Sequence, residues 1–257
     1  MLGFQFNDYC GIGKANKHDI NHVCTFSMSP TKPSRLDSFA SIESETMQGK
    51  VDQTVNFAVP ENIVSPHYCE RLPNGFPLHL NRGGKGLLCS PDQRPTLFTA
   101  HLPEVLDWLH RQEKPKPMEE EPCEVPVLLF DKEMSTESLL FHYDGTPASA
   151  RLIHHFVDMF QDNIHQSRAT IISPCFIPKS KLREEQEIVQ IITNATAETS
   201  FIKFNFNRIG DFWSYAVKHQ CTLLVTTKNY QSDLAKVLFH FYKGGMWYDR
   251  LSFYLSF

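Results

Sequence analysis

The fold class predicted from the sequence is α/β, a doubly wound and mainly parallel sheet, and three observations predict it. The second half of the chain alternates short apolar segments with segments of helical periodicity, as parallel sheets flanked by helices do. The run VPVLLF (Val125 to Phe130) is apolar throughout, which is typical of a strand buried on both faces. The 257 residues suffice for one large domain or two of modest size.

The elements of the second half follow in a regular order. Each apolar, β-rich segment is followed by a segment with apolar residues at helical spacing, and a last apolar segment closes the chain. We expect strands at 139–143, 169–174, 199–206, 221–227 and 251–257, and helices at 147–160, 182–194, 211–219 and 232–241.

The first half is less regular. Alternating residues predict strands at 21–28, 53–59, 75–84 and 96–100, the apolar run predicts another at 125–130, and apolar spacing predicts a helix at 102–112. The segment 28–50 is rich in Ser, Thr and Pro and is expected to be a long loop. A polar stretch after Phe130 is expected to hold the domain boundary, which gives domains at 1–132 and 136–257.

Composition bounds the functional classes. A net charge of -4 argues against a nucleic-acid partner, and no apolar run reaches the ~20 residues of a membrane helix, so we expect neither nucleic acid nor membrane as a partner. No signal peptide is recognised at the N-terminus. The odd number of seven cysteines indicates reduced, buried thiols rather than a disulfide framework, and we expect a cytoplasmic location. The sequon at Asn194 would then be silent.

The second half resembles a universal stress protein domain. The likeness rests on LLFHYDGTPASARLIHHFVDMF, ATIISP, DFWSYAVKHQCTLLVTT and SDLAKVLFHFY, and it covers Ser138 to Phe257. In the first half, HYCERLPNGFPLHLNRGGKGLL is similar to a third strand with its following helix, and PCEVPVLLF to a closing strand. The resemblance implies two tandem copies of a five-stranded, adenine-nucleotide alpha-hydrolase-like fold, the first degenerate, as in bacterial tandem universal stress proteins. Before residue 60 the likeness is weak, with Asp8 as the nearest match to the acid of a first strand.

The resemblance also implies a nucleotide site at the carboxyl ends of the strands. Its members that bind ATP or AMP use a loop of three glycines and a hydroxyl residue after the fourth strand. Thr227, Tyr230, His240 and Phe241 stand at those positions here, so side chains replace the glycines that let backbone amides approach phosphates. The residues left to form such a site are Asp144, Gly145, Thr146, Ile172, Ser173, Thr226 and Thr227.

Several motifs have structural alternatives. Asp144 before Gly145 can form a turn or cap the following helix, and Thr146 can serve as that cap instead. GIGK at Gly11 lacks the spacing of a phosphate loop. His18 and His22, with Cys10 and Cys24, could hold zinc, but their segment leads into an expected strand, so we expect no metal. His219 and Cys221 could form a nucleophile pair, or Cys221 could be core.

The sequence therefore predicts a non-enzymatic, stress-associated regulatory or protein-interaction protein without a catalytic residue or a resident cofactor. An adenine-nucleotide sensor that binds ATP or AMP is the alternative, and a Cys/His hydrolase is a remote one. Because an uncovered apolar edge invites aggregation, we expect LSFYLSF (Leu251 to Phe257) to pair with VPVLLF in an intramolecular pseudo-dimer, or with a second subunit in a homodimer.

Overall fold

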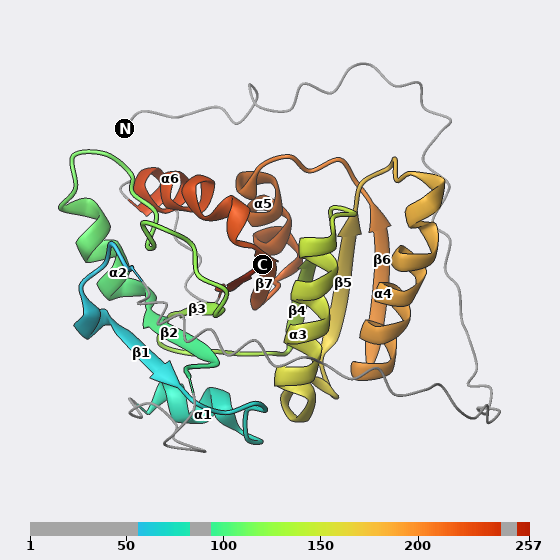
Figure 1. Ribbon diagram of the computed structural model, residues 1–257, viewed down its shortest axis with the longest axis horizontal. Helices are drawn as coiled ribbons and strands as arrows, with labels where there is room; N and C mark the ends of the chain where they lie inside the picture. The colour runs from blue at the N-terminus through green and yellow to red at the C-terminus, as the bar shows by residue number, and fades with distance from the viewer. Residues whose placement is uncertain (1–55, 83–93, 243–250) are drawn as a thin grey trace, which may run out of the picture. The chain divides into compact units, whose positions relative to one another are not determined.

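A single sheet runs through the part of the chain that the computed structural model describes, residues 56–82, 94–242 and 251–257. Its strands are β1 (Val64–His67), β2 (Leu97–His101), β3 (Val127–Phe130), β4 (Ser138–His142), β5 (Arg168–Ser173), β6 (Glu198–Lys203), β7 (Leu223–Thr227) and β8 (Ser252–Ser256). They lie in the order β1-β2-β3-β8-β7-β4-β5-β6. Figure 1 shows the sheet, with β8 unlabelled. The α/β class with a mainly parallel sheet is thus confirmed.

The five strands of the second half are all parallel to their neighbours within that half. From β4 the chain first moves outward through β5 to β6, and then returns to the other side of β4 with β7 and β8. The strand order therefore reverses between β4 and β7. In open α/β sheets, ligands bind outside the carboxyl ends of the strands at such a switch point.

Helices cover both faces of this sheet (Figure 1). They are α1 (Phe76–Asn81), α2 (Leu102–His110), α3 (Pro147–Ile164), α4 (Leu182–Ala195), α5 (Ile209–His219) and α6 (Gln231–Tyr242). Apolar side chains of α1, α3 and α4 pack in one core, and those of α2, α5 and α6 pack in another on the opposite face. Successive residues of β4 alternate between them, with Leu139 and Phe141 in the first core and Leu140 in the second.

The two halves of the chain meet where β3 and β8 pair antiparallel, with Leu128 opposite Tyr254. Tyr254 is fully buried and packs edge-on against Phe156 and Phe160 of α3. On the other face, the ring of Phe253 stacks on Trp213 of α5 at 5.7 Å. Strand β8 is therefore covered on both faces and along both edges, and the described strands of the two halves form one eight-stranded sheet.

Two strand predictions of the first half are wrong. Residues 75–84 were expected to be extended, but Phe76–Asn81 forms α1, which starts after Gly75 in the left-handed region (φ 77°) and carries a proline in its first turn. Within 53–59, the described residues make only an isolated bridge from Phe57 to Glu119, and the nearby strand is β1 at Val64–His67. The expected elements at 21–28 and 28–50, the residues Asp8, Cys10, Gly11, His18, His22 and Cys24, and the segment 243–250 lie outside the described residues.

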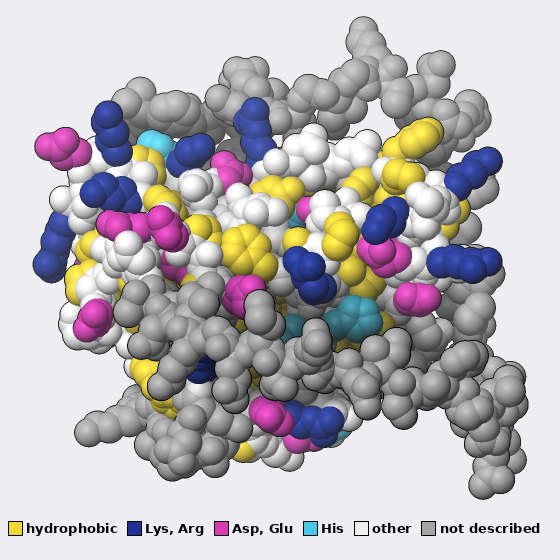
Figure 2. Space-filling model, viewed as in Figure 1, with side chains coloured by type: hydrophobic (Ala, Val, Ile, Leu, Met, Phe, Trp, Pro, Cys, Tyr) yellow, Lys and Arg dark blue, Asp and Glu magenta, His cyan; other side chains and the backbone are white. Residues whose placement is uncertain are grey.

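The cysteine prediction is wrong at one position. Cys69 is disulfide-bonded, whereas Cys123, Cys175 and Cys221 are free thiols, and of these only Cys221 is buried. Because disulfides persist mainly in oxidising compartments, this bond does not support the cytoplasmic location, which stays a prediction. A search of the described helices finds none with the length and apolar character needed to span a membrane. On the face shown in Figure 2, Lys and Arg side chains are interspersed with Asp and Glu, in keeping with the small net charge.

Candidate functional site

The predicted site residues lie at the carboxyl ends of β4, β5 and β7, around the switch point. Tyr143, directly after β4, donates its backbone N–H to the carbonyl of Ile172 in β5 at 3.0 Å. Thr226 and Thr227 end β7 on the other side of β4. Ile172, Ser173, Thr226 and Thr227 are all buried, whereas Asp144 and Gly145 are partly exposed and Thr146 is exposed. The fold thus brings the seven residues to one edge of the sheet, although only three of them reach its surface.

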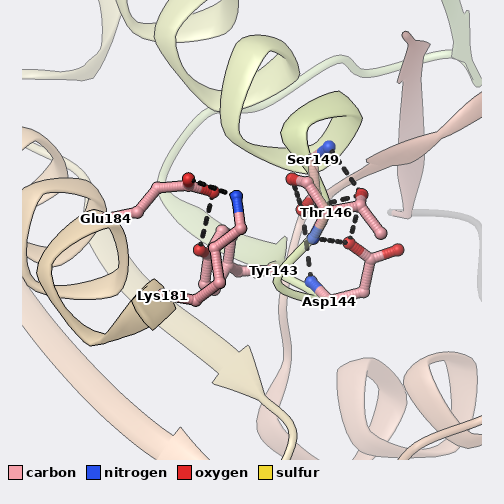
Figure 3. Close-up of polar contacts among 6 residues, drawn as sticks. All are labelled: Tyr143, Asp144, Thr146, Ser149, Lys181 and Glu184. Carbon is pink, nitrogen blue, oxygen red and sulfur yellow. Dashed lines mark hydrogen bonds and ion pairs between the residues drawn. The ribbon is translucent and has the colours of Figure 1, made fainter. Parts of the chain in front are cut away.

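Asp144 forms the turn that starts α3 (Figure 3). Its Oδ1 accepts hydrogen bonds from the Thr146 N–H at 2.9 Å and from the Thr146 hydroxyl at 2.6 Å. Thr146 is the N-cap, because its Oγ1 accepts from the backbone N–H of Ser149 at 3.2 Å. Gly145 between them has φ 78°, a conformation that a side chain would strain. Of the structural alternatives for this corner, Asp144 forms the turn and Thr146, not Asp144, caps the helix.

The protonation of Asp144 follows from these contacts. Burial raises the pKa of its carboxyl, but hydrogen bonds from Ser149 and Thr146, together with the nearby His142 imidazole, outweigh burial and hold this pKa below its usual value. The carboxylate is therefore ionised at neutral pH, and its Oδ1 accepts hydrogen bonds within its own turn.

The space beside Gly145 is also limited. The side chain of Ile177, in the segment between β5 and α4, comes within 3.6 Å of where a Cβ on Gly145 would lie.

Two further polar pairs occupy the ends of β4 and β5. The Tyr143 hydroxyl donates to Glu184 at 3.1 Å, and Lys181 pairs with the other carboxylate oxygen of Glu184 at 2.7 Å (Figure 3). At the end of β5, Ser173 donates to the carboxylate of Glu185, which also pairs with Lys203 at the end of β6. Hydrogen bonding to Lys181 lowers the pKa of Glu184. These polar groups satisfy one another without a ligand.

His142, the last residue of β4, lies buried at the centre of this corner. Its Nδ1 is 3.0 Å from the Thr226 hydroxyl, and its ring packs at 4.3 Å from that of Phe212 and 4.9 Å from that of Tyr230. Burial lowers the pKa of His142 to about 4, although the Asp144 charge opposes that shift. The imidazole is therefore neutral at physiological pH. Tyr230, which stands at the second glycine position, fills space against this histidine.

The turn after β7 is a short 3-10 helix, Lys228–Tyr230, that continues directly into α6. His240 and Phe241, at the third glycine and hydroxyl positions, belong to the last turn of α6 and not to a loop. Thr227 Oγ1 is buried and has no hydrogen-bond partner among the described residues. The residues that the resemblance aligns with a glycine loop thus lie in a 3-10 helix and in α6.

Lys228 is the most unusual residue of this turn, since its side chain is 0% exposed. Its Nζ donates to the Glu119 carboxylate, to the Cys123 carbonyl and to the Val125 carbonyl, each at 2.7 Å. Glu119, 1% exposed, also accepts from the Cys123 N–H at 3.2 Å and from its thiol at 3.1 Å. All three ammonium protons have acceptors and Oε1 of the carboxylate has three donors, as a buried ion pair requires. The Phe257 ring lies 5.9 Å from Nζ.

Sequence reasoning missed the Lys228–Glu119 pair. Glu119 lies in a charged, proline-rich stretch without helical or strand periodicity, 109 positions before Lys228 in the chain. A lysine directly after a buried apolar strand was the one local signal, because lysine is seldom fully buried unless it is paired.

A separate hollow of about 220 Å³ lies at the opposite, amino-terminal ends of β4, β5 and β6. Both members of the suggested nucleophile pair, His219 and Cys221, line it, with Tyr215 and Thr170. The His219 ring stacks on Tyr215 at 4.1 Å, and burial raises the pKa of the Cys221 thiol. Because a thiol needs a lowered pKa to act as a nucleophile at neutral pH, the environment of Cys221 favours a core thiol. The described residues contain no cluster suited to a metal ion.

Comparison with known proteins gives no matching family model and no match among curated proteins. Among solved structures, the chain is similar to a universal stress protein from Archaeoglobus fulgidus DSM 4304, with 9% identity, a TM-score of 0.42, and coverage of 68% of this chain and 70% of that one. It is also similar to the protein Rv1636 from Mycobacterium tuberculosis H37Rv, with 14% identity, a TM-score of 0.28, and coverage of 35% of this chain and 69% of that one.

Proposed function

We propose that the chain is a universal-stress-protein-like regulatory or protein-interaction protein that acts without catalysis and without a bound nucleotide. The sequence resemblance of Ser138 to Phe257 supports the family part of this proposal, and so does the switch point between β4 and β7. The observation that carries the second part is the turn after β7. Lys228–Tyr230 is helical there, Lys228 is buried against Glu119, and Tyr230 packs on His142.

A phosphate loop needs backbone amides that point at the ligand with no side chain between them. In this chain the amides after β7 enter a helix, and the one cation of the turn already has a carboxylate as its partner. The pairing of β3 with β8 within the chain supports the pseudo-dimer part of the proposal, in which the two halves associate through their closing strands.

The alternative function, an adenine-nucleotide sensor, is favoured by one observation: Asp144, Ile172 and Thr226 lie around the switch point, where such a ligand would bind. A thermal-shift titration of the whole chain with ATP, ADP and AMP distinguishes the two functions. A ligand at a hundredfold its Kd adds about 2.7 kcal/mol of stability, which is about 5–10 °C for a domain of this size.

The proposed function predicts no shift with any of the three nucleotides beyond that of sodium tripolyphosphate at equal ionic strength. A saturable shift with a nucleotide, lost in Asp144→Ala, would establish the sensor instead. Glu184→Gln is the matched control, because it changes a carboxylate near this corner that lies outside the predicted nucleotide set.

A further inference from the structure

The described sheet ends at β1 on one side and at β6 on the other, and Figure 1 shows both strands. Every strand between them, including β8, is paired along both edges. A strand from a second copy of the chain can therefore join the described sheet only at β1 or at β6. At such an end, every second backbone N–H and C=O points away from the sheet, and these groups can pair with another chain.

The two ends of the sheet differ in how well they are protected against such pairing. β1 has four residues and contains Pro66, which lacks a backbone N–H. β6 has six residues without proline, and its charges lie at its two ends, with Glu198 first and Lys203 last. Within the strand, Ser200 and Phe201 are exposed. β6 is therefore the longer and less protected of the two ends.

Exposed apolar side chains gather at β6. The described part of the chain has six large hydrophobic side chains that are exposed, and four of them belong to β6 or to the segments at its carboxyl end: Phe176 (93%), Phe204 (48%), Leu182 (42%) and Phe201 (38%). The Cys175 N–H donates to Asn205 Oδ1 at 2.9 Å, which fixes the segment of Phe176 beside the residues that follow β6. A group of exposed apolar side chains is typical of an interaction surface.

β6 can pair with its own copy in an antiparallel arrangement. Around a two-fold axis normal to the sheet, residues directly opposite each other lie on the same face. With the axis at Phe201, this ring lies opposite Phe201 of the partner subunit, and Thr199 lies opposite Lys203 of the partner subunit. Aromatic cross-strand pairs stabilise a sheet, and no like charges face each other in this register. The acidic start of one strand also lies beside the basic end of the other.

We propose that the chain forms a homodimer in which β6 pairs antiparallel with β6 of a second copy, with Phe201 at the two-fold axis. The two eight-stranded sheets then continue into one, and the exposed apolar side chains at the carboxyl end of each β6 lie against the amino end of the other. This dimer differs from one through the closing strands, because both edges of β8 are paired within the chain. It is independent of the proposed function, since its partner is the chain itself.

Charges placed at the two-fold axis test this dimer. Phe201→Glu and Phe201→Lys each set like charges opposite each other, so each variant should have the 29.6 kDa mass of one chain at concentrations where wild type has twice that mass. An equimolar mixture of the two variants should recover the doubled mass, because opposite charges then face each other. Val217→Lys is the matched control, since Val217 of α5 is 39% exposed, and it should dimerise as wild type does. Sedimentation velocity of the whole chain measures each mass.

A disulfide tests the register and does not depend on the charged variants folding. In Phe201→Cys the opposed Cα atoms would lie about 4.5–5.5 Å apart, which is within the range of about 4.4–6.8 Å that a disulfide spans. Mild oxidation should cross-link most chains of this variant, whereas Val217→Cys should stay largely uncrosslinked. Both are made with Cys175→Ser, because Cys175 is an exposed free thiol.

Hydrogen exchange of the β6 amides distinguishes the remaining outcomes. A monomeric wild-type chain whose β6 amides exchange slowly would show that another segment of the same chain covers this edge, and rapid exchange in a monomer would show that the edge is bare. Either result refutes the dimer. The proposal is also overturned if both charged variants keep the doubled mass, if their mixture does not recover it, or if Phe201→Cys cross-links no more than Val217→Cys.

Discussion

Removing Lys228 tests how much the buried ion pair contributes to stability. Lys228→Met leaves the Glu119 carboxylate 1% exposed and without its counter-charge, and it takes the donor from two carbonyls that accept at 2.7 Å. Breaking one side of a buried pair costs about 3–5 kcal/mol. Since domains are stable by about 5–15 kcal/mol, the loss is a large share of the total, and it lowers the Tm by roughly 6–20 °C at this size.

Urea unfolding followed by circular dichroism measures the change, with Lys236→Met as control because Lys236 is an exposed lysine of α6. The control should stay within about 0.5 kcal/mol of wild type. The double variant Lys228→Met with Glu119→Met should recover most of the loss, because two apolar residues replace two charges that had to be desolvated. A loss below about 1 kcal/mol for Lys228→Met, or no recovery in the double variant, would refute this account of the pair.

Three further predictions concern the switch-point corner and the thiols. Asp144→Ala should cost about 1 kcal/mol at neutral pH, because the Thr146 N–H and hydroxyl lose their acceptor. Since the folded pKa of Asp144 is lowered, that difference should shrink in urea titrations as the pH falls below about 3.9. The folded pKa of His142 is about 4, so the unfolded chain takes up a proton at this residue first as the pH is lowered from about 6.5 to 4. Over that range His142 should lower the free energy of unfolding by up to about 1.4 kcal/mol per pH unit, and His142→Gln should flatten the profile. Iodoacetamide at pH 7.5 should alkylate exposed Cys175 at least about tenfold faster than buried Cys221, as peptide mass mapping would show, and equal rates would contradict the assigned burial.

The second half of the chain could be predicted because its periodicity is unambiguous. Its strands are short apolar runs bounded by turns, and its helices are at least eleven residues long, so the two periods do not compete. In the first half, the segment FPLHLN carries both periods. Phe76, Leu78 and Leu80 alternate as in a strand, yet Phe76 and Leu80 also lie four apart as on a helix. The helix is formed, with Leu78 58% exposed and the other two buried.

The turn at Asp144 could also be predicted from the sequence, because its hydrogen bonds join residues that are close together in the chain. Asp144, Thr146 and Ser149 lie within six residues of one another, so turn chemistry alone indicates their bonds. The pair of Lys228 and Glu119 depends instead on the pairing of β3 with β8, because the segment 118–125 that carries Glu119 leads directly into β3. Local patterns in one sequence indicate that Lys228 needs a partner, but they do not say which of 29 acidic residues supplies it.

Most polar side chains around the switch point already form hydrogen bonds or ion pairs with one another, and this affects how tightly a nucleotide could bind. Oδ1 of Asp144 accepts from Thr146, the Ser173 hydroxyl bonds to Glu185 and Lys203, and Lys228 pairs with Glu119. At the end of β7, Thr227 Oγ1 is buried without a hydrogen-bond partner among the described residues. A nucleotide that bound through these groups would have to break the bonds first. Each bond contributes about 1 kcal/mol, and more where a charge is involved, so two or three of them would weaken binding by about 30-fold or more. This cost favours a structural role for these side chains over a role in reversible nucleotide binding.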